Sequence, residues 1–130
     1  MGRKTSDQVG STAHLPEAEQ QCAVRVSNEA LERLNMHPGG DAVRTPLRCE
    51  CGDPDCSVCV EITHTEYEAV RDYGSHFVIK PNHENPENAS VLSENARFAV
   101  IDVVVADARY RVLACNPRHA WIGARDWSSE

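Results

Sequence analysis

The clearest periodic pattern in the sequence lies near the N-terminus, where apolar residues recur at every fourth position. This series consists of Cys22, Val26, Ala30 and Leu34, with Ala23 and Leu31 beside it. A four-residue spacing places side chains on one face of an α-helix, and Pro16 suits a first helical position. The pattern predicts a helix over 16–35 that turns the apolar series, including a core Cys22, toward the interior. Arg25, Glu29 and Arg33 then form a charged outer face.

Strand patterns follow farther along the chain. Val58, Val60 and Ile62 alternate with Cys59 and polar residues, which is the two-residue period of a half-buried strand. Three other segments favour strands because they are short apolar or β-branched runs. These are 77–80, 97–105 and, as a hairpin partner of the latter, 109–115.

A second, shorter helix is predicted between these strands. Thr65 and Glu68 fit the spacing of a capping box, in which a side-chain oxygen and a carboxylate satisfy free backbone N–H groups. The helix then runs over 66–73, and Tyr67 and Val70 face the core. This pattern adds a second helix to the predicted fold.

Together these elements predict a small α+β domain with an N-terminal helix, a short second helix and a small antiparallel sheet. Residues 1–15 are polar and aperiodic, so we expect a disordered tail. Residues 116–130 form a C-terminal tail, which leaves a single domain over 16–115 with a loop at 84–95. Two Trp, three Tyr and two Phe in 130 residues make a thin core, which a bound metal could staple.

Four of the six cysteines fall within eleven residues, and they dominate the candidate chemistry. They are Cys49, Cys51, Cys56 and Cys59. Leu47 is expected to begin a short strand that carries the first two, and Gly52–Asp55 has turn chemistry that folds Cys56 back toward them. Zinc prefers four Cys or His ligands in a tetrahedron. The cluster therefore predicts a zinc site.

Three other chemistries remain open for this cluster. Disulfides need an oxidising compartment, but residues 1–10 lack the apolar run of a signal peptide, so we expect a cytoplasmic protein. A [2Fe–2S] cluster fits the spacing of Cys51, Cys56 and Cys59, although Cys115 is a distant fourth ligand. A catalytic or redox-sensing thiol is the third alternative.

Cys59 and His83 compete for the fourth ligand position beside Cys49, Cys51 and Cys56. Cys59 is close in sequence, but the strand pattern turns it away from the core. His83 lies in a Pro-rich turn about thirty residues on, so its ligation would close a longer loop. We predict Cys49, Cys51, Cys56 and His83 as ligands, with Cys59 as the alternative.

Several segments resemble a group of small uncharacterised proteins of high-GC bacteria. The shared patterns are C-E-C-G-x3-C at 49–56, E-Y-x-x-V-R at 66–71, and an F-V-V-x-P-G-H-E turn matched by 77–84. The resemblance implies a zinc site made by three cysteines and the histidine of the turn. It carries over here as Cys49, Cys51, Cys56 and His83. This chain differs at Asn82, where Gly is usual, and at the additional Cys59.

The formal net charge of −7 argues against nucleic acid as the main partner, because phosphate contacts need a basic face. Residues 97–125 nevertheless hold five Arg against two Asp. No nucleophile–base pair is evident, so we expect no enzymatic activity. No run reaches transmembrane length. The sequence favours a structural zinc module that binds another protein, with regulation as a role open to it. The alternatives are a zinc-dependent nucleic-acid binder and a thiol-based redox sensor.

Overall fold

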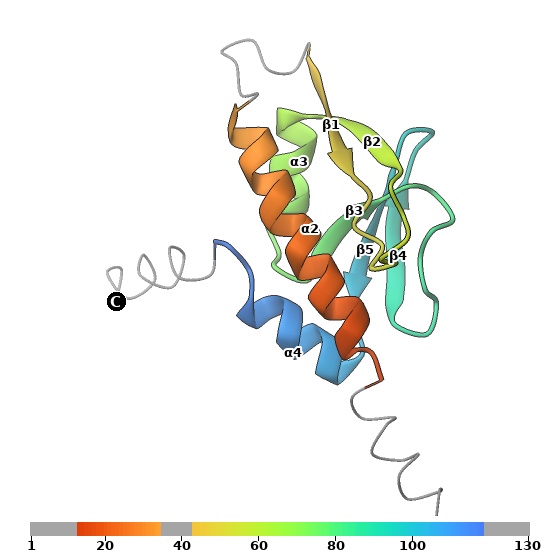
Figure 1. Cartoon of the computed structure of the whole chain (residues 1–130). Helices are drawn as coiled ribbons and strands as arrows, with labels where there is room; N and C mark the ends of the chain where they lie inside the picture. The colour runs from red at the N-terminus through yellow and green to blue at the C-terminus, as the bar shows by residue number, and fades with distance from the viewer. Residues whose placement is uncertain (1–12, 35–42, 119–130) are drawn as a thin grey trace, which may run out of the picture.

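The computed structural model describes residues 13–34 and 43–118 (Figure 1). The described elements, in chain order, are α2 (Leu15–Leu34), β1 (Arg44–Arg48), β2 (Cys59–Thr63), α3 (His64–Val70), β3 (His76–Ile79), β4 (Ala89–Glu94), β5 (Ala99–Val103) and α4 (Ala106–Ala114). These helices and antiparallel strands confirm the predicted α+β class. Residues 1–12, 35–42 and 119–130 lie outside the described part, so the predicted domain limits and tails stay predictions.

Two small antiparallel sheets form the β part of the molecule. The strands β1 and β2 pair as a hairpin, with Leu47 opposite Val60. The other sheet has the order β3-β5-β4, so β5 is its central strand and Phe77 lies opposite Ile101. The helix α2 lies along one side of both sheets, and α4 crosses near its N-terminal end (Figure 1). This arrangement leaves the region after β1 between α2 and β3, where the candidate site lies.

The core consists of two clusters of buried side chains. One joins α2, α4 and the β3–β5 sheet, with Phe77, Ile101 and Val112 among its members. The other lies under α3 and contains Tyr67 and Ile62. Burial of these apolar side chains supplies most of the driving force for folding.

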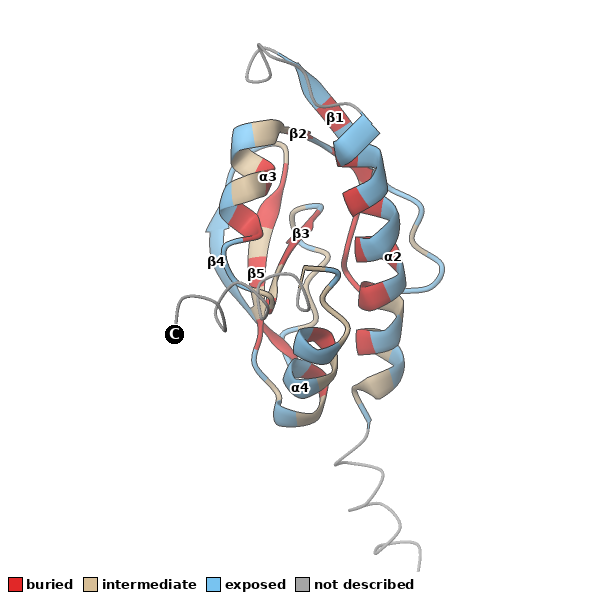
Figure 2. Ribbon diagram, turned by 90° about the vertical axis from the view of Figure 1, so that its left-hand side faces the viewer, coloured by how far each residue is buried: buried red, intermediate tan, exposed pale blue. Residues whose placement is uncertain are grey.

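The helix predicted over 16–35 is confirmed as α2 and Cys22 is buried in the core as predicted, but the rest of the predicted inner face is wrong. Val26 is 55% exposed and Leu34 81% exposed, whereas Arg25 is only 2% exposed. The buried residues of α2 lie on the side of the helix that faces the rest of the molecule (Figure 2), and they are Ala18, Gln21, Cys22, Val24, Arg25, Asn28, Glu29 and Glu32. Most of them are polar, and they can be buried because partners elsewhere in the fold accept or donate their hydrogen bonds.

Two predictions in the C-terminal half are also wrong. The segment 109–115 was expected to be a strand, but residues 109–114 belong to α4 and Cys115 is its C-cap. The helix α4 contains three Ala and a Leu, which are strong helix formers, and Ala108 and Val112 bury one helical face. The predicted loop over 84–95 contains β4, where only Ala89 is buried. Because β4 is an edge strand with little burial, its sequence has no apolar alternation.

The short second helix begins two residues earlier than predicted. Thr63, not Thr65, is the N-cap. Its side chain accepts a hydrogen bond from the N–H of Glu66, and the carboxylate of Glu66 accepts one from the N–H of Thr63. The helix α3 therefore covers His64–Val70. Tyr67 and Val70 face the core as predicted, with exposures of 0% and 4%.

A disulfide joins Cys22 on α2 to Cys115 at the end of α4, with 6.2 Å between the Cα atoms. The sequence had predicted only a small core residue at Cys22. The bond closes a loop across 93 sequence positions and fixes the two helices to each other. Among the described residues, no helix is long and apolar enough to cross a membrane.

Candidate metal centre

Four potential metal ligands from three parts of the chain meet at one end of the sheets. Cys49, Cys51, Cys56 and His83 each offer one ligand atom, and these four atoms all lie within 4.8 Å of one another. The Nδ1 of His83 is 3.5 Å from the Sγ of Cys49 and 3.6 Å from the Sγ of Cys56. These residues therefore lie close enough to bind a metal ion.

The first two cysteines lie just after β1 rather than within it. The strand ends at Arg48, and the backbone of Cys49 continues the pairing with an N–H···O bond to Val58 at 2.9 Å. Glu50 then pairs its N–H with the carbonyl of Val78 on β3. This crossing from one sheet to the other leaves Cys49 and Cys51 buried beside the turn that carries Cys56.

The turn between Cys51 and Cys56 depends on glycine. Gly52 has a φ of +89°, which L side chains rarely adopt, and an added Cβ would lie 2.3 Å from the Cγ of Glu17. Asp53 completes the turn, because its side chain accepts from the N–H of Asp55 and its carbonyl accepts from Cys56. The predicted turn chemistry is confirmed, and it returns Cys56 to the first two thiols.

The histidine turn has a similar local requirement. Asn82 has a φ of +75°, and asparagine is one of the few residues besides glycine that tolerates this region. The N–H of His83 donates to the carbonyl of Lys80 at 3.1 Å. The N–H of Lys80 donates to the Sγ of Cys49 at 3.2 Å, so the turn contacts the cluster through its backbone as well.

A buried ion pair with α2 supports the segment that carries Cys49 and Cys51. The carboxylate of Glu50, which is fully buried between the two cysteines, accepts bonds of 2.9 and 2.7 Å from Arg25 on α2. It also accepts from Asn28 at 3.0 Å and from the N–H of Val78 at 2.9 Å. The sequence analysis missed this role, because it placed Arg25 on the exposed face of the helix.

The thiols of Cys49 and Cys51 are electrostatically linked. The hydrogen bond from Cys49, with help from the backbone of Asp53, lowers the pKa of the Cys51 thiol to about 5 despite its burial. The same hydrogen bond, together with burial, raises the pKa of Cys49. One thiol of the pair is thus readily ionised, and thiolate is the form that binds metals.

The donor set and its spacing fit a tetrahedral ion. With metal–sulfur and metal–nitrogen bonds of about 2.3 and 2.1 Å, a tetrahedral zinc site has an S···N edge of about 3.6 Å. The two measured S···N distances from His83 are 3.5 and 3.6 Å. The imidazole of His83 and the thiols of Cys49 and Cys56 therefore already have the separations of such a site.

Cys59 lies outside this group. It is exposed at the start of β2, opposite Arg48, as the strand alternation predicted. The structure brings His83, rather than Cys59, beside the other three predicted ligands. The competing disulfide interpretation does not describe the cluster, because Cys49, Cys51, Cys56 and Cys59 are all free thiols in the structure.

Comparisons of the chain with protein-family models, with curated proteins and with solved structures find no match.

Proposed function

We propose that this protein is a structural zinc module that acts by binding another protein. The observation that carries the zinc assignment is the close group of three thiols and one imidazole at Cys49, Cys51, Cys56 and His83. Soft thiolate ligands with an imidazole favour zinc over the harder cations, which prefer oxygen ligands.

The closed ligand set supports a structural role for the metal rather than a catalytic one. Four protein ligands leave no coordination position for a substrate or an activated water, whereas catalytic zinc sites keep one position open. The metal would join the β1–β2 connection to the turn after β3, between Cys49 and His83, which are 34 positions apart. A ligand set that joins distant segments stabilises a thin core.

Exposed apolar side chains in a groove beside α3 support a protein partner. Tyr73 is 63% exposed and Leu92 50% exposed, and both line an open groove between α3 and the β4–β5 edge. The floor of this groove includes Val70 and Phe98. Apolar surface of this kind is common where soluble proteins bind one another.

The nucleic-acid alternative has less support, because arginines that suggested it have carboxylate partners. The pairs among the described residues are Arg97 with Glu66, Arg109 with Asp102, Arg111 with Glu19, and Arg118 with Glu29 and Glu68. Paired arginines contribute little free positive charge for phosphate contacts. With a net charge of −7, the chain is a better match for a protein partner.

The zinc proposal is tested by elemental analysis of the purified protein and a competition titration with a chelator. We expect one zinc per chain and no visible absorption. His83→Ala should weaken zinc binding by more than about 100-fold, because it removes a ligand and not merely a supporting contact. Cys59→Ser is the matched control and should leave the affinity unchanged. Iron with visible bands, or the reverse ranking of the two variants, would contradict the proposal.

The partner proposal needs a separate experiment. Native lysate is passed over the immobilised full chain with and without a zinc chelator, and over the His83→Ala variant. A partner retained only by the zinc-loaded wild-type protein is the expected result. Retention of random DNA in a salt-dependent manner would favour the nucleic-acid binder instead. If peroxide releases the zinc and a thiol reductant then restores zinc binding, the redox sensor would be favoured.

A further inference from the structure

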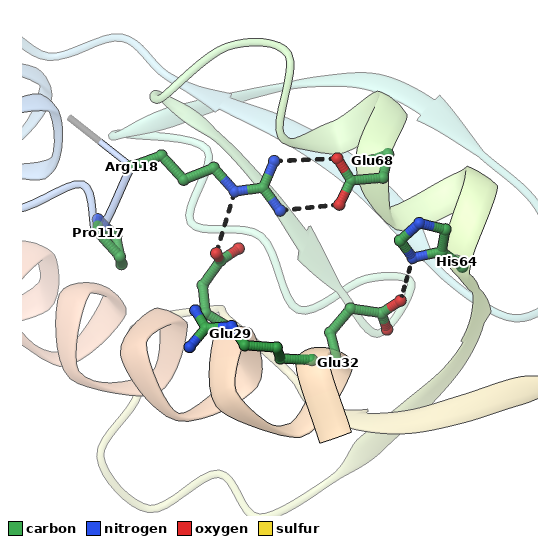
Figure 3. A pocket seen from close by; sticks show the side chains of 7 residues that line it. Glu29, Glu32, His64, Glu68, Pro117 and Arg118 are labelled. Carbon is green, nitrogen blue, oxygen red and sulfur yellow. Dashed lines mark hydrogen bonds and ion pairs between the residues drawn. The ribbon is translucent and has the colours of Figure 1, made fainter. Parts of the chain in front are cut away.

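A second candidate site lies at the other end of α2, away from the thiol group. There the structure contains a cavity of about 330 Å³ between α2, α3 and the segment after α4. Figure 3 shows Glu29 and Glu32 of α2 facing His64 and Glu68 of α3 across this space, with Arg118 closing one side. The remaining lining residues are Arg33 and Pro117.

Two of the three carboxylates in the cavity already have cationic partners. Glu29 accepts hydrogen bonds from Arg71 at 2.7 Å and from Arg118 at 3.0 Å. Glu68 accepts two bonds from the same Arg118 guanidinium, at 3.0 and 2.8 Å. The charges of these two carboxylates are therefore balanced within the fold.

Glu32 differs from both. Its side chain is only 5% exposed, and its one hydrogen bond joins Oε2 to the Nδ1 of His64 at 2.6 Å. The other oxygen, Oε1, is buried and has no hydrogen-bond partner. A buried carboxylate oxygen without a donor is costly, so a donor brought by a ligand would stabilise this part of the molecule.

We propose that this cavity binds an organic cation through a primary ammonium or guanidinium group that pairs with Glu32. The chain itself shows that the cavity wall accepts such a group, because the guanidinium of Arg118 lies against Glu68 and Glu29 with three hydrogen bonds. A carboxylate–guanidinium pair of this geometry is strong and specific. The proposal is independent of the zinc module, since the cavity shares no residue with the thiol group.

The geometry favours an organic cation over a metal ion. Among the described residues, the one group of three or more His, Cys, Asp or Glu side chains placed to hold a metal ion is that of Cys49, Cys51, Cys56 and His83. The oxygens of Glu29, Glu32 and Glu68 are thus not gathered around a single point. A ligand that fills part of the cavity and extends one charged group toward Glu32 fits this spacing better.

The test is a titration of the isotopically labelled full chain, followed by NMR at constant ionic strength. The probes are agmatine, a small molecule with a primary ammonium group at one end and a guanidinium group at the other, and an acetylated, amidated Gly-Arg-Gly peptide. We expect saturable shifts at Glu32, His64 and Glu68 with at least one probe. Tighter binding of the peptide would assign the cation to a polypeptide side chain, and tighter binding of agmatine would assign it to a small molecule.

Glu32→Gln keeps the shape of the side chain and removes its charge, and it should weaken binding about tenfold or more. Glu94→Gln, on the exposed edge strand β4, is the matched control and should have no effect. The proposal is overturned if neither probe gives saturable shifts, or if Glu32→Gln binds as well as the wild type. It is also overturned if Mg²⁺ or Mn²⁺ shifts the same residues at lower concentrations than either probe. If Glu32→Gln does not fold, the wild-type titration alone decides.

Discussion

Two buried carboxylates near α2, Glu50 and Glu32, lie in different surroundings. Glu50 accepts four hydrogen bonds, from Arg25, Asn28 and the backbone of Val78. Glu32 accepts one, from His64, and lines a cavity. Both are almost fully buried. The difference lies in how completely the fold itself satisfies each charge.

This difference separates structural burial from burial that serves a ligand. When the chain supplies every partner of a buried charge, the hydrogen bonds fix the segments that provide them. For Glu50 these segments are α2, the loop at 49–56 and β3. A buried charge that lacks some of its hydrogen-bond partners destabilises the fold, and a ligand that supplies the missing donor lowers this cost. We therefore assign Glu50 to the support of the metal centre and Glu32 to ligand binding. The predictions below test this separation.

The largest effect is expected from metal removal. Structural zinc typically contributes on the order of 10 kcal/mol to folding. Two of the four candidate ligands, Cys49 and Cys51, are the sequence neighbours of Glu50. Chelation should therefore unfold residues 45–105, while the α2 helix persists in part. The measurement is the dispersion of amide signals in the NMR spectrum before and after chelation. An apo protein with the dispersion of the loaded form would show that the metal does not hold this region.

The next effect compares the arginine partners in the two regions. Arg25→Ala leaves the fully buried Glu50 without its counter-charge, which should lower the free energy of unfolding by about 3–5 kcal/mol. Arg118→Ala removes the ion pair with the 43% exposed Glu68 and one of the two arginine partners of Glu29, which keeps Arg71, so the loss should be about 1 kcal/mol. Denaturant unfolding of the zinc-loaded variants measures both. Equal losses would remove the distinction between the regions.

The disulfide between Cys22 on α2 and Cys115 at the end of α4 joins these two helices. Its removal by Cys115→Ser should lower the free energy of unfolding by about 2–4 kcal/mol, because a long loop is no longer closed in the unfolded chain. Denaturant unfolding in the absence of reductant measures this effect, with Cys59→Ser as the control for loss of a thiol. A change no larger than that of the control would mean that the bond does not constrain the fold in solution.

The last effect depends on pH and concerns Glu29, which lines the cavity beside Glu32. Burial raises its pKa, but hydrogen bonds from Tyr67, Arg71 and Arg118 outweigh this and lower the pKa to about 2. Its stabilising contribution is therefore complete above the unfolded pKa of about 4.3 and is lost as the pH falls toward 2. We expect a loss on the order of 2–3 kcal/mol over this interval. Glu29→Gln should flatten the pH dependence of unfolding there, and an unchanged slope would contradict the assignment.

The sequence predicted the parts of this protein that depend on local chemistry. Turn residues such as Gly52 and Asp53, with the alternation of Val60 and Ile62, were enough to predict the metal loop and the strand that follows it. The apolar runs at 77–80 and 97–105 likewise predicted β3 and β5. The alternation around Cys59 also predicted its exposure. These signals depend on the residue itself and its neighbours in sequence, so no knowledge of the rest of the fold was needed.

Only the tertiary structure decided which side of α2 is buried, and with it the roles of Arg25, Glu29 and Glu32. The apolar series that includes Val26 and Leu34 was the more hydrophobic choice, but hydrogen bonds and ion pairs offset the cost of burying a polar side chain when the fold supplies its partner. Those partners, Glu50, Tyr67, Arg71 and His64, come from distant positions and cannot be inferred from the helix alone. The pairing of Cys22 with Cys115 has the same origin, because it depends on the packing of α2 against α4.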